Sequence, residues 1–168
     1  ESTVTFELDE VLRGVDSRVV AMNDEVEGQL RVDPTDLGAT ELGTIVIGAQ
    51  TFETDSSNRD RAIRGPILDA GTFPRITFEP TSIDGLEGDV SVGEQVEFSV
   101  TGDLTIRDVT QEVTFDVTAT QTAEDRIEGR AMSTVSREAF GLTIPSVASV
   151  ANVSDEVDVA IDFVATPA

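Results

Sequence analysis

The side chains of this sequence that could do chemistry are carboxylates, hydroxyls and arginines. Among its 168 residues there is no His, Cys, Trp or Tyr, and all 11 basic residues are Arg. A Ser-His-Asp or Cys-His nucleophile, a Lys Schiff base and a His-based metal site therefore cannot be built. A carboxylate pair acting on a glycosidic bond remains the one credible catalytic system. With 33 acidic residues such pairs arise by chance, and no Trp or Tyr can stack on a sugar.

Arginines are the other candidates for a binding role, because a planar guanidinium suits phosphate and quinone oxygens. Three of them, Arg59, Arg64 and Arg137, lie on stretches without strand-like alternation. They are the headgroup candidates for an oxygen-bearing ligand. The alternative is that each pairs with a neighbouring carboxylate at the surface.

The stretch Asp55 to Asp60 is rich in oxygen-bearing side chains, as a calcium-binding loop would be. Arg59 interrupts the run, and no Gly follows where such a loop turns sharply. We therefore expect a loop or a helix cap here, no metal site, and no cofactor elsewhere.

The net charge of −22 excludes nucleic acid as a partner, because its phosphates would be repelled. Anionic membrane surfaces are disfavoured for the same reason. No apolar run approaches the length of about 18 residues that a membrane span requires, so none is expected. A hydrated acidic surface of this kind is typical of proteins from salt-adapted organisms.

Strands must position these side chains, and the segment Glu94–Thr120 shows this best. Apolar and polar residues alternate from Val96 to Ile106, and the alternation resumes from Val113 to Ala119. Successive side chains of a strand point to opposite faces, so one face of this segment is dry and the other is wet. A short connection around Asp108 predicts an antiparallel hairpin.

Six further stretches with the same pattern bring the total to eight strands. They are residues 1–12, 18–33 with a bend at 22–24, 39–51, a strand opening at 74, 126–135 and 157–165. Small inward residues in 126–135, such as Gly129 and Ala131, are expected to leave room beneath the sheet. A short helix through Arg59–Arg64 is expected in the loop after the third strand.

Eight antiparallel strands fit either a sandwich of two sheets or a closed barrel. Long strands in nearly sequential order favour the barrel. The length of the chain favours a single domain, residues 1–168, with one core.

Four groups of residues occur in order along the chain: Arg59-Asp60 with Ile63-Arg64 and Leu68-Asp69; Phe73 to Phe78; Val100 to Ile106 with Val109-Thr110 and Val113; and Arg137 with Phe140 to Leu142. Together they resemble the YceI-like family of lipid-binding barrels. The first third departs from that family by lacking its usual His-Ser and His-Met features. Asp108 also stands where the family usually has Gly in the hairpin turn, and we expect the turn to survive because Asp tolerates a left-handed conformation.

The resemblance implies an all-β fold, an extended eight-stranded antiparallel lipocalin-like barrel with an elongated apolar cavity. It further implies a non-catalytic protein that binds or carries an amphiphilic isoprenoid lipid of the quinone or prenyl-phosphate type, or another long apolar small molecule. Many members are exported, so a periplasmic, cell-surface or secreted location is expected, although no signal segment is present in this sequence. Whether the barrel forms a homodimer is left open.

The apolar residues expected to line the cavity come from strands and irregular segments alike. They are Phe6, Ile45, Ile47, Phe52, Ile63, Ile67, Phe73, Phe78, Phe98, Leu104, Ile106, Phe115, Phe140, Leu142, Ile144 and Phe163. A barrel can use the same inward row either to fill a core or to contact a lipid tail. The competing function is therefore a cell-surface or periplasmic interaction module with a filled β core.

Overall fold

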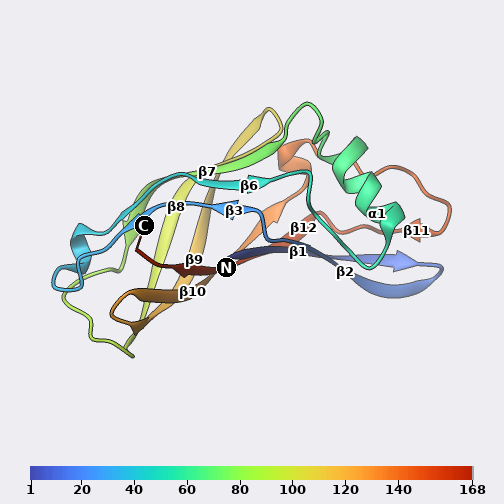
Figure 1. The fold of residues 1–168 in the computed structure, drawn as a ribbon. Coiled ribbons are helices and arrows are strands. Elements are labelled where there is room, and N and C mark those ends of the chain that lie inside the picture. Colours follow the sequence, from blue (N-terminus) through green and yellow to red (C-terminus); the bar gives the residue numbers. More distant parts are fainter. Residues whose placement is uncertain (168) are drawn as a thin grey trace.

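Long strands and one short helix make up most of the molecule, for which a computed structural model describes residues 1–167 (Figure 1). The long strands are β1 (Thr3–Leu12), β2 (Val15–Asn23), β7 (Arg75–Asp84), β8 (Gln95–Ile106), β9 (Val109–Ala123), β10 (Arg126–Ser136) and β12 (Glu156–Ala165). The short ones are β3 (Val26–Glu27), β4 (Leu30–Arg31), β5 (Glu41–Leu42), β6 (Ile45–Gly48) and β11 (Val150–Ala151). Helix α1 (Ser57–Ala62) continues into a π-helical turn, Ile63–Ile67, and 3-10 turns form at Leu37–Ala39 and Glu138–Phe140.

The strands follow one another around a nearly closed antiparallel barrel. Ten of them form one sheet in the order β11-β1-β12-β10-β9-β8-β7-β6-β3, with β2 on the other side of β1. This order is that of the chain itself, except that β11 and β12 both pair with β1, with Leu12 opposite Val150 and Val4 opposite Ile161. The all-β antiparallel barrel with one short helix after the third strand, predicted from the sequence, is confirmed. In residues 1–167 no helix is long and apolar enough to cross a membrane.

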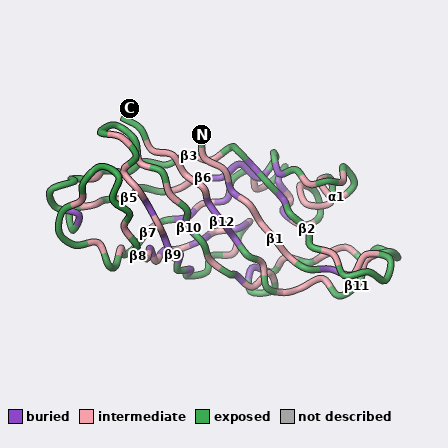
Figure 2. The backbone as a smooth tube through the Cα atoms, turned by 90° about the horizontal axis from the view of Figure 1, so that it is seen from below, coloured by how far each residue is buried: buried purple, intermediate pink, exposed green. Residues whose placement is uncertain are grey.

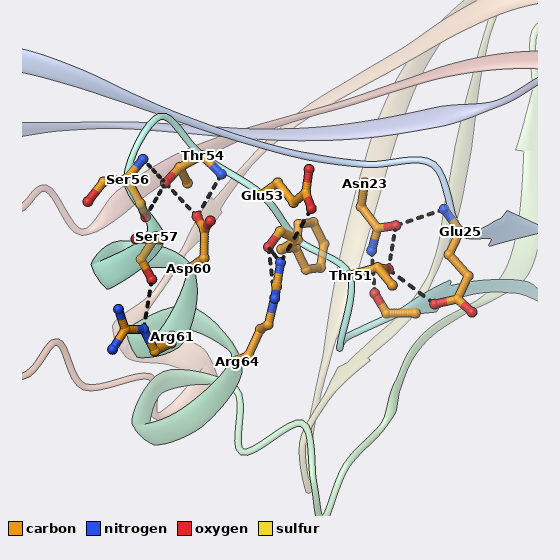
Figure 3. Close-up of polar contacts among 12 residues, drawn as sticks. Asn23, Glu25, Thr51, Glu53, Thr54, Ser56, Ser57, Asp60, Arg61 and Arg64 are labelled. Atoms are coloured by element: carbon orange, nitrogen blue, oxygen red, sulfur yellow. Dashed lines mark hydrogen bonds and ion pairs between the residues drawn. The ribbon is translucent and has the colours of Figure 1, made fainter.

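The barrel closes through a bend between β2 and β3, because β2 pairs with β1 whereas β3 pairs with β6. At the bend, Met22 exchanges two backbone hydrogen bonds with Glu53, both 2.9 Å long. The buried side chain of Asn23 donates to the Gly48 carbonyl and accepts from the Glu25 amide (Figure 3). The bend predicted at residues 22–24 is thus where one strand passes from one neighbour to the other.

The sheet is split between β9 and β10. These strands pair from the hairpin that joins them only as far as Asp116 opposite Met132, and then diverge (Figure 1). The 3-10 turn after β10 packs against β9, where Gln111 Nε2 donates to the Ala139 carbonyl at 3.1 Å. Because β9 keeps β8 and β10 keeps β12 as neighbours, the split is a slot within the wall and not an edge of the sheet.

The inward side chains form one continuous apolar core. Figure 2 shows where along the backbone the buried residues lie. The rings of Phe78 and Phe115 meet edge to face with their centroids 5.1 Å apart. A Cβ added to Gly102 would lie 2.8 Å from the Phe78 ring, and one added to Gly129 would lie 2.4 Å from the Phe163 ring. At Gly129, the room expected beneath β10 is therefore taken by an aromatic ring.

Two predicted strands are shorter than expected. The stretch 18–33 holds only β2, β3 and the two-residue β4, which pairs with β5 in a separate small sheet, and 39–51 shortens to β5 and β6. The chain between β4 and β5 is hydrogen-bonded to the loop after β7 instead. The Leu37 amide donates to the Gly88 carbonyl at 2.8 Å, and the Val90 amide donates to the Pro34 carbonyl at 2.9 Å.

Candidate ligand-binding site

The apolar interior is the candidate site, and most residues predicted to line it belong to the core. The buried ones are Ile47, Phe52, Phe78, Leu104, Ile106, Phe115 and Phe140. The half-buried ones packed against the same cluster are Phe6, Ile45, Ile63, Ile67, Phe98, Leu142 and Phe163. Phe73 and Ile144 are half-buried but stand outside this cluster. A ligand contact at any of these side chains stays a prediction.

The helical segment covers one end of this interior. Helix α1 and the π-helical turn lie across the barrel at the end where the β8–β9 hairpin turns (Figure 1). Ile63 and Ile67 of that turn pack against the core, and the ring of the fully buried Phe52 lies 4.9 Å from that of Phe6. Two of the predicted headgroup arginines belong to this segment.

Arg59 is held by a buried carboxylate that the sequence analysis did not single out. Glu10 continues the inward apolar row of β1 and is only 7% exposed. Arg59 Nη2 donates to Glu10 Oε1 at 2.9 Å, and its Nη1 donates to Asp55. The pair ties α1 to the inner face of β1, so this guanidinium is engaged by the protein itself. Extending the alternation of β1 by one step would have placed Glu10 inside.

Arg64 reaches back to the chain before the helix. Its Nε and Nη2 donate to the Phe52 carbonyl at 3.0 and 2.7 Å, and Nη2 lies 3.9 Å from the Glu53 carboxylate (Figure 3). Burial raises the pKa of the nearby Asp60, but hydrogen bonds from Thr54 and the charges of the two arginines bring that pKa below its ordinary value. Asp60 therefore stays ionised beside them.

Arg137 fastens the turn at the slot. Its Nη1 donates to the Leu142 carbonyl at 2.7 Å, and its Nε donates to the Ser154 carbonyl at 3.4 Å. A hydrogen bond from the Glu138 amide is the main reason why the pKa of Asp155 is lowered, and the Arg137 charge adds to the effect. Backbone oxygens, and not the expected carboxylate, are thus the hydrogen-bond partners of Arg137.

A further arginine at the covered end, Arg107, was not predicted from the sequence as a headgroup candidate. Arg107 is the first residue of the two-residue turn between β8 and β9, and its φ is 58°. Its guanidinium lies 6.0 Å from the centre of the Phe73 ring, and Nη1 is 3.5 Å from the Ile67 carbonyl. We expected the left-handed conformation at Asp108, and the structure places it one residue earlier. Alternation up to Ile106 and a two-residue turn would have placed Arg107 at the first turn position, which was the available sequence signal.

Two open concavities lie beside the slot between β9 and β10. The first, of about 290 Å³, is lined in part by the buried core residues Val113, Val135 and Phe140. The second, of about 510 Å³, spreads over the outer face where Arg18 and Met132 lie. The slot is therefore a place where the apolar core approaches the surface.

The carboxyl groups with shifted pKa values bear on the alternative of a carboxylate-pair glycoside hydrolase. A general acid in a glycoside hydrolase has a raised pKa. Where a carboxyl pKa clearly shifts within residues 1–167, it is lowered, as for Asp33, Asp60, Asp155 and Asp158. In the same part of the chain no group of three or more acidic side chains is arranged to hold a metal ion. The carboxylate-pair hypothesis therefore gains no support.

The chain matches a known protein family over nearly its whole length. The model of the family described as the YceI-like domain matches residues 1–165. The chain belongs to the YceI-like family. The resemblance seen in the sequence is thereby confirmed. A comparison with curated proteins finds no match.

Solved structures share the fold of this YceI-like chain. BcnA of Burkholderia cenocepacia is 22% identical, with 98% of this chain and 96% of that one covered and a TM-score of 0.73. A polyisoprenoid binding domain from Saccharophagus degradans, implicated in plant cell wall breakdown, is 15% identical, with 99% and 94% covered and a TM-score of 0.77. The YceI protein of Campylobacter jejuni is 17% identical, with 88% and 84% covered and a TM-score of 0.69.

Proposed function

We propose that this YceI-like protein binds an amphiphilic isoprenoid lipid, of the quinone or prenyl-phosphate type, in its apolar interior and catalyses no reaction. The observation that carries the proposal is the continuous inward row of apolar side chains, which the helix covers at one end and of which Val113, Val135 and Phe140 line an open concavity at the slot. Each buried methylene of a tail contributes about 0.8 kcal/mol, so a prenyl chain can bind tightly without many polar contacts.

The half-buried rings give the tail its contact surface. Phe98 and Phe163 stand on inward rows, yet both retain exposed area. Phe163 lies over Gly129, where the absence of a Cβ lets the ring pack directly on the backbone of β10. The likeness to the polyisoprenoid binding domain of Saccharophagus degradans supports the same ligand class. An exported location, periplasmic, cell-surface or secreted, is part of the proposal.

The first test is to find the lipid. Protein purified under native conditions is expected to release an isoprenoid on solvent extraction, and native mass spectra are expected to show a lipid-bound species. Delipidated protein is then titrated with geranylgeranyl menaquinone and with geranylgeranyl phosphate. The proposal would be overturned if repeated spectra show only the bare polypeptide and the delipidated protein binds neither ligand. That result would favour the interaction module with a filled core.

A pair of variants locates the tail. Ala131→Phe puts a ring on the inward row of β10, where Ala131 is 9% exposed, and Met132→Phe puts the same ring on the outer face, where Met132 is 53% exposed. We expect the first to weaken lipid binding about tenfold or more and the second to leave binding unchanged. Equal effects would show that the tail does not lie inside.

A further inference from the structure

Arg107 has more unused hydrogen-bonding capacity than the three arginines singled out from the sequence. Arg59 has two carboxylate partners, Arg64 makes two bonds to one carbonyl, and Arg137 binds two carbonyls. Arg107 makes one long hydrogen bond, 3.5 Å to the Ile67 carbonyl, and its buried Nε has no acceptor within residues 1–167. A guanidinium carries several N–H donors, and a buried donor left without an acceptor costs stability.

The backbone of Arg107 carries a second cost. A φ of 58° is left-handed, which is unfavourable for any residue with a Cβ and free of strain for Gly. Strained backbone and buried, under-bonded donors concentrate where a protein binds something. The turn holds an arginine where a glycine would be more stable and, unlike the exposed Arg13 with its φ of 52°, Arg107 also buries an Nε without an acceptor within residues 1–167; the two observations together point to a role for the side chain.

The charge of Arg107 is also uncompensated at close range. The ion pairs formed within residues 1–167 involve Arg18, Arg31, Arg59, Arg64, Arg126 and Arg130. Arg107 is not among them, although the chain has 33 acidic residues. Its guanidinium instead faces the Phe73 ring at 6.0 Å, which leaves its charge free to meet an oxygen acceptor.

Arg107 lies where the apolar core ends. Ile67, whose carbonyl it contacts, and Val109, which follows the turn, both pack against the core cluster. We propose that Arg107 is the residue that hydrogen-bonds the oxygen-bearing headgroup of the isoprenoid, a quinone carbonyl or a phosphate oxygen. This inference rests on the proposed function, because it requires the tail to lie in the barrel. Phe73, outside the core, then belongs to the headgroup end of the site.

Three ligands of one chemical family separate the headgroup from the tail. They are geranylgeranyl phosphate, geranylgeranyl menaquinone and phytane, an isoprenoid hydrocarbon without a headgroup. In the full-length chain, Arg107→Gly is expected to weaken binding of the two headed ligands about tenfold or more and to leave phytane binding unchanged. Arg107→Lys keeps the charge and the left-handed strain but loses the planar guanidinium. Compared with Arg107→Gly, we expect it to recover part of the phosphate binding and less of the quinone binding.

The β1–β2 turn provides a matched control. Arg13 is also the first residue of a two-residue turn, its φ is 52°, and its side chain is exposed. Arg13→Gly therefore gives the same relief of backbone strain away from Arg107 and is expected to leave binding of all three ligands unchanged. Thermal unfolding of both variants confirms that each is folded before binding is measured.

The outcomes separate the two proposals. If Arg107→Gly weakens phytane as much as the headed ligands, or weakens none of them, Arg107 is structural and the headgroup assignment is wrong while lipid binding stands. A loss confined to the phosphate identifies the anion as the group bound, and a loss for both headed ligands identifies any oxygen acceptor. If the unmodified protein binds none of the three, the proposed function fails and the assignment fails with it.

Discussion

The buried carboxylate of Glu10 has a large effect on the stability of this protein. A carboxylate taken out of water costs several kcal/mol, and that cost is offset only by a partner held in good geometry. Arg59 is this partner, at 2.9 Å, with its side chain 21% exposed. Because Arg59 is on α1 and Glu10 on β1, this ion pair joins the covering helix to the barrel wall, beside the packing of Ile63 and Ile67 against the core.

We expect Arg59→Ala to lower the free energy of unfolding by about 3 kcal/mol, because it leaves Glu10 buried without a partner. Urea unfolding followed by circular dichroism measures the change. Arg31→Ala is the control: its pair with Glu41 is similarly short, 3.0 Å, but the two side chains are 81% and 69% exposed. Its loss should stay below about 0.5 kcal/mol. If both variants lose the same amount, the burial of Glu10 contributes nothing.

The double variant Glu10→Leu with Arg59→Leu is a further check on the pair. Removing both charges leaves no uncompensated carboxylate, so most of the lost stability should return. If the double variant is as unstable as Arg59→Ala alone, the loss comes from the packing of the arginine stem and not from its charge.

Strands were readable from the sequence where their partner is the next strand in the chain. The β8–β9 hairpin appears as predicted because alternation and a short turn are both local signals. The slot between β9 and β10 was not readable, because β9 alternates equally well where β10 pairs with it and where β10 has diverged from it. The shortening of the strands around residues 28–44 was not readable for a similar reason: the chain between them, at Pro34 and Leu37, is hydrogen-bonded to a loop distant in sequence, after β7.

The glycines of the wall give a test of how closely strands and rings pack. A Cβ on Gly102 would lie 2.4 Å from the Glu79 carbonyl oxygen, so Gly102→Ala must move the backbone of β7 or β8. We expect a loss of about 2 kcal/mol in the free energy of unfolding. Gly71→Ala meets no atom within 4 Å and should change it by less than about 0.5 kcal/mol. Equal losses of unfolding free energy in the two variants would show that β7 and β8 can move apart without loss of stability.

The molecule as a whole is strongly acidic, and this affects its stability more than its fold. A net charge of −22 on one small barrel produces self-repulsion that unfolding relieves. Local pairs such as Arg18 with Glu7, Asp9 and Asp158 offset part of it, and their hydrogen bonds raise the pKa of Arg18. Too few arginines are present to neutralise the rest.

Salt is therefore expected to stabilise this protein. Raising ionic strength from about 0.01 M to about 1 M shortens the screening length from about 30 Å to about 3 Å, which weakens long-range repulsion more than close pairs. The midpoint of thermal unfolding should rise with KCl concentration and stay lower in sucrose of equal osmolality. A midpoint that falls as KCl is added would mean that the arginine pairs outweigh the repulsion.

Alternation predicted the strands, and their length and order together with the family resemblance predicted the barrel, but none of these signals identified the partners of the site residues. The inward rows could be assigned because the side-chain period of a strand is fixed. The partners of Arg64 and Arg137 could not, because they are carbonyls that only the folded chain brings near. Arg107 was missed because the turn was centred on Asp108, whereas Ile106 pairs with Val109 and the left-handed residue is Arg107.

The pairing of β1 with β12 also constrains the order in which the protein can form. Thr3 lies opposite Asp162, so the barrel joins residues from nearly opposite ends of the chain. Contacts this distant in sequence require a long loop to close, which slows folding. During synthesis, β1 can pair with β2 at once but leaves the ribosome long before β12, its other partner, and until β12 emerges the apolar row of β1 has no closed barrel around it. Folding of this protein is therefore expected to begin in the β7–β10 meander and to finish with the two ends.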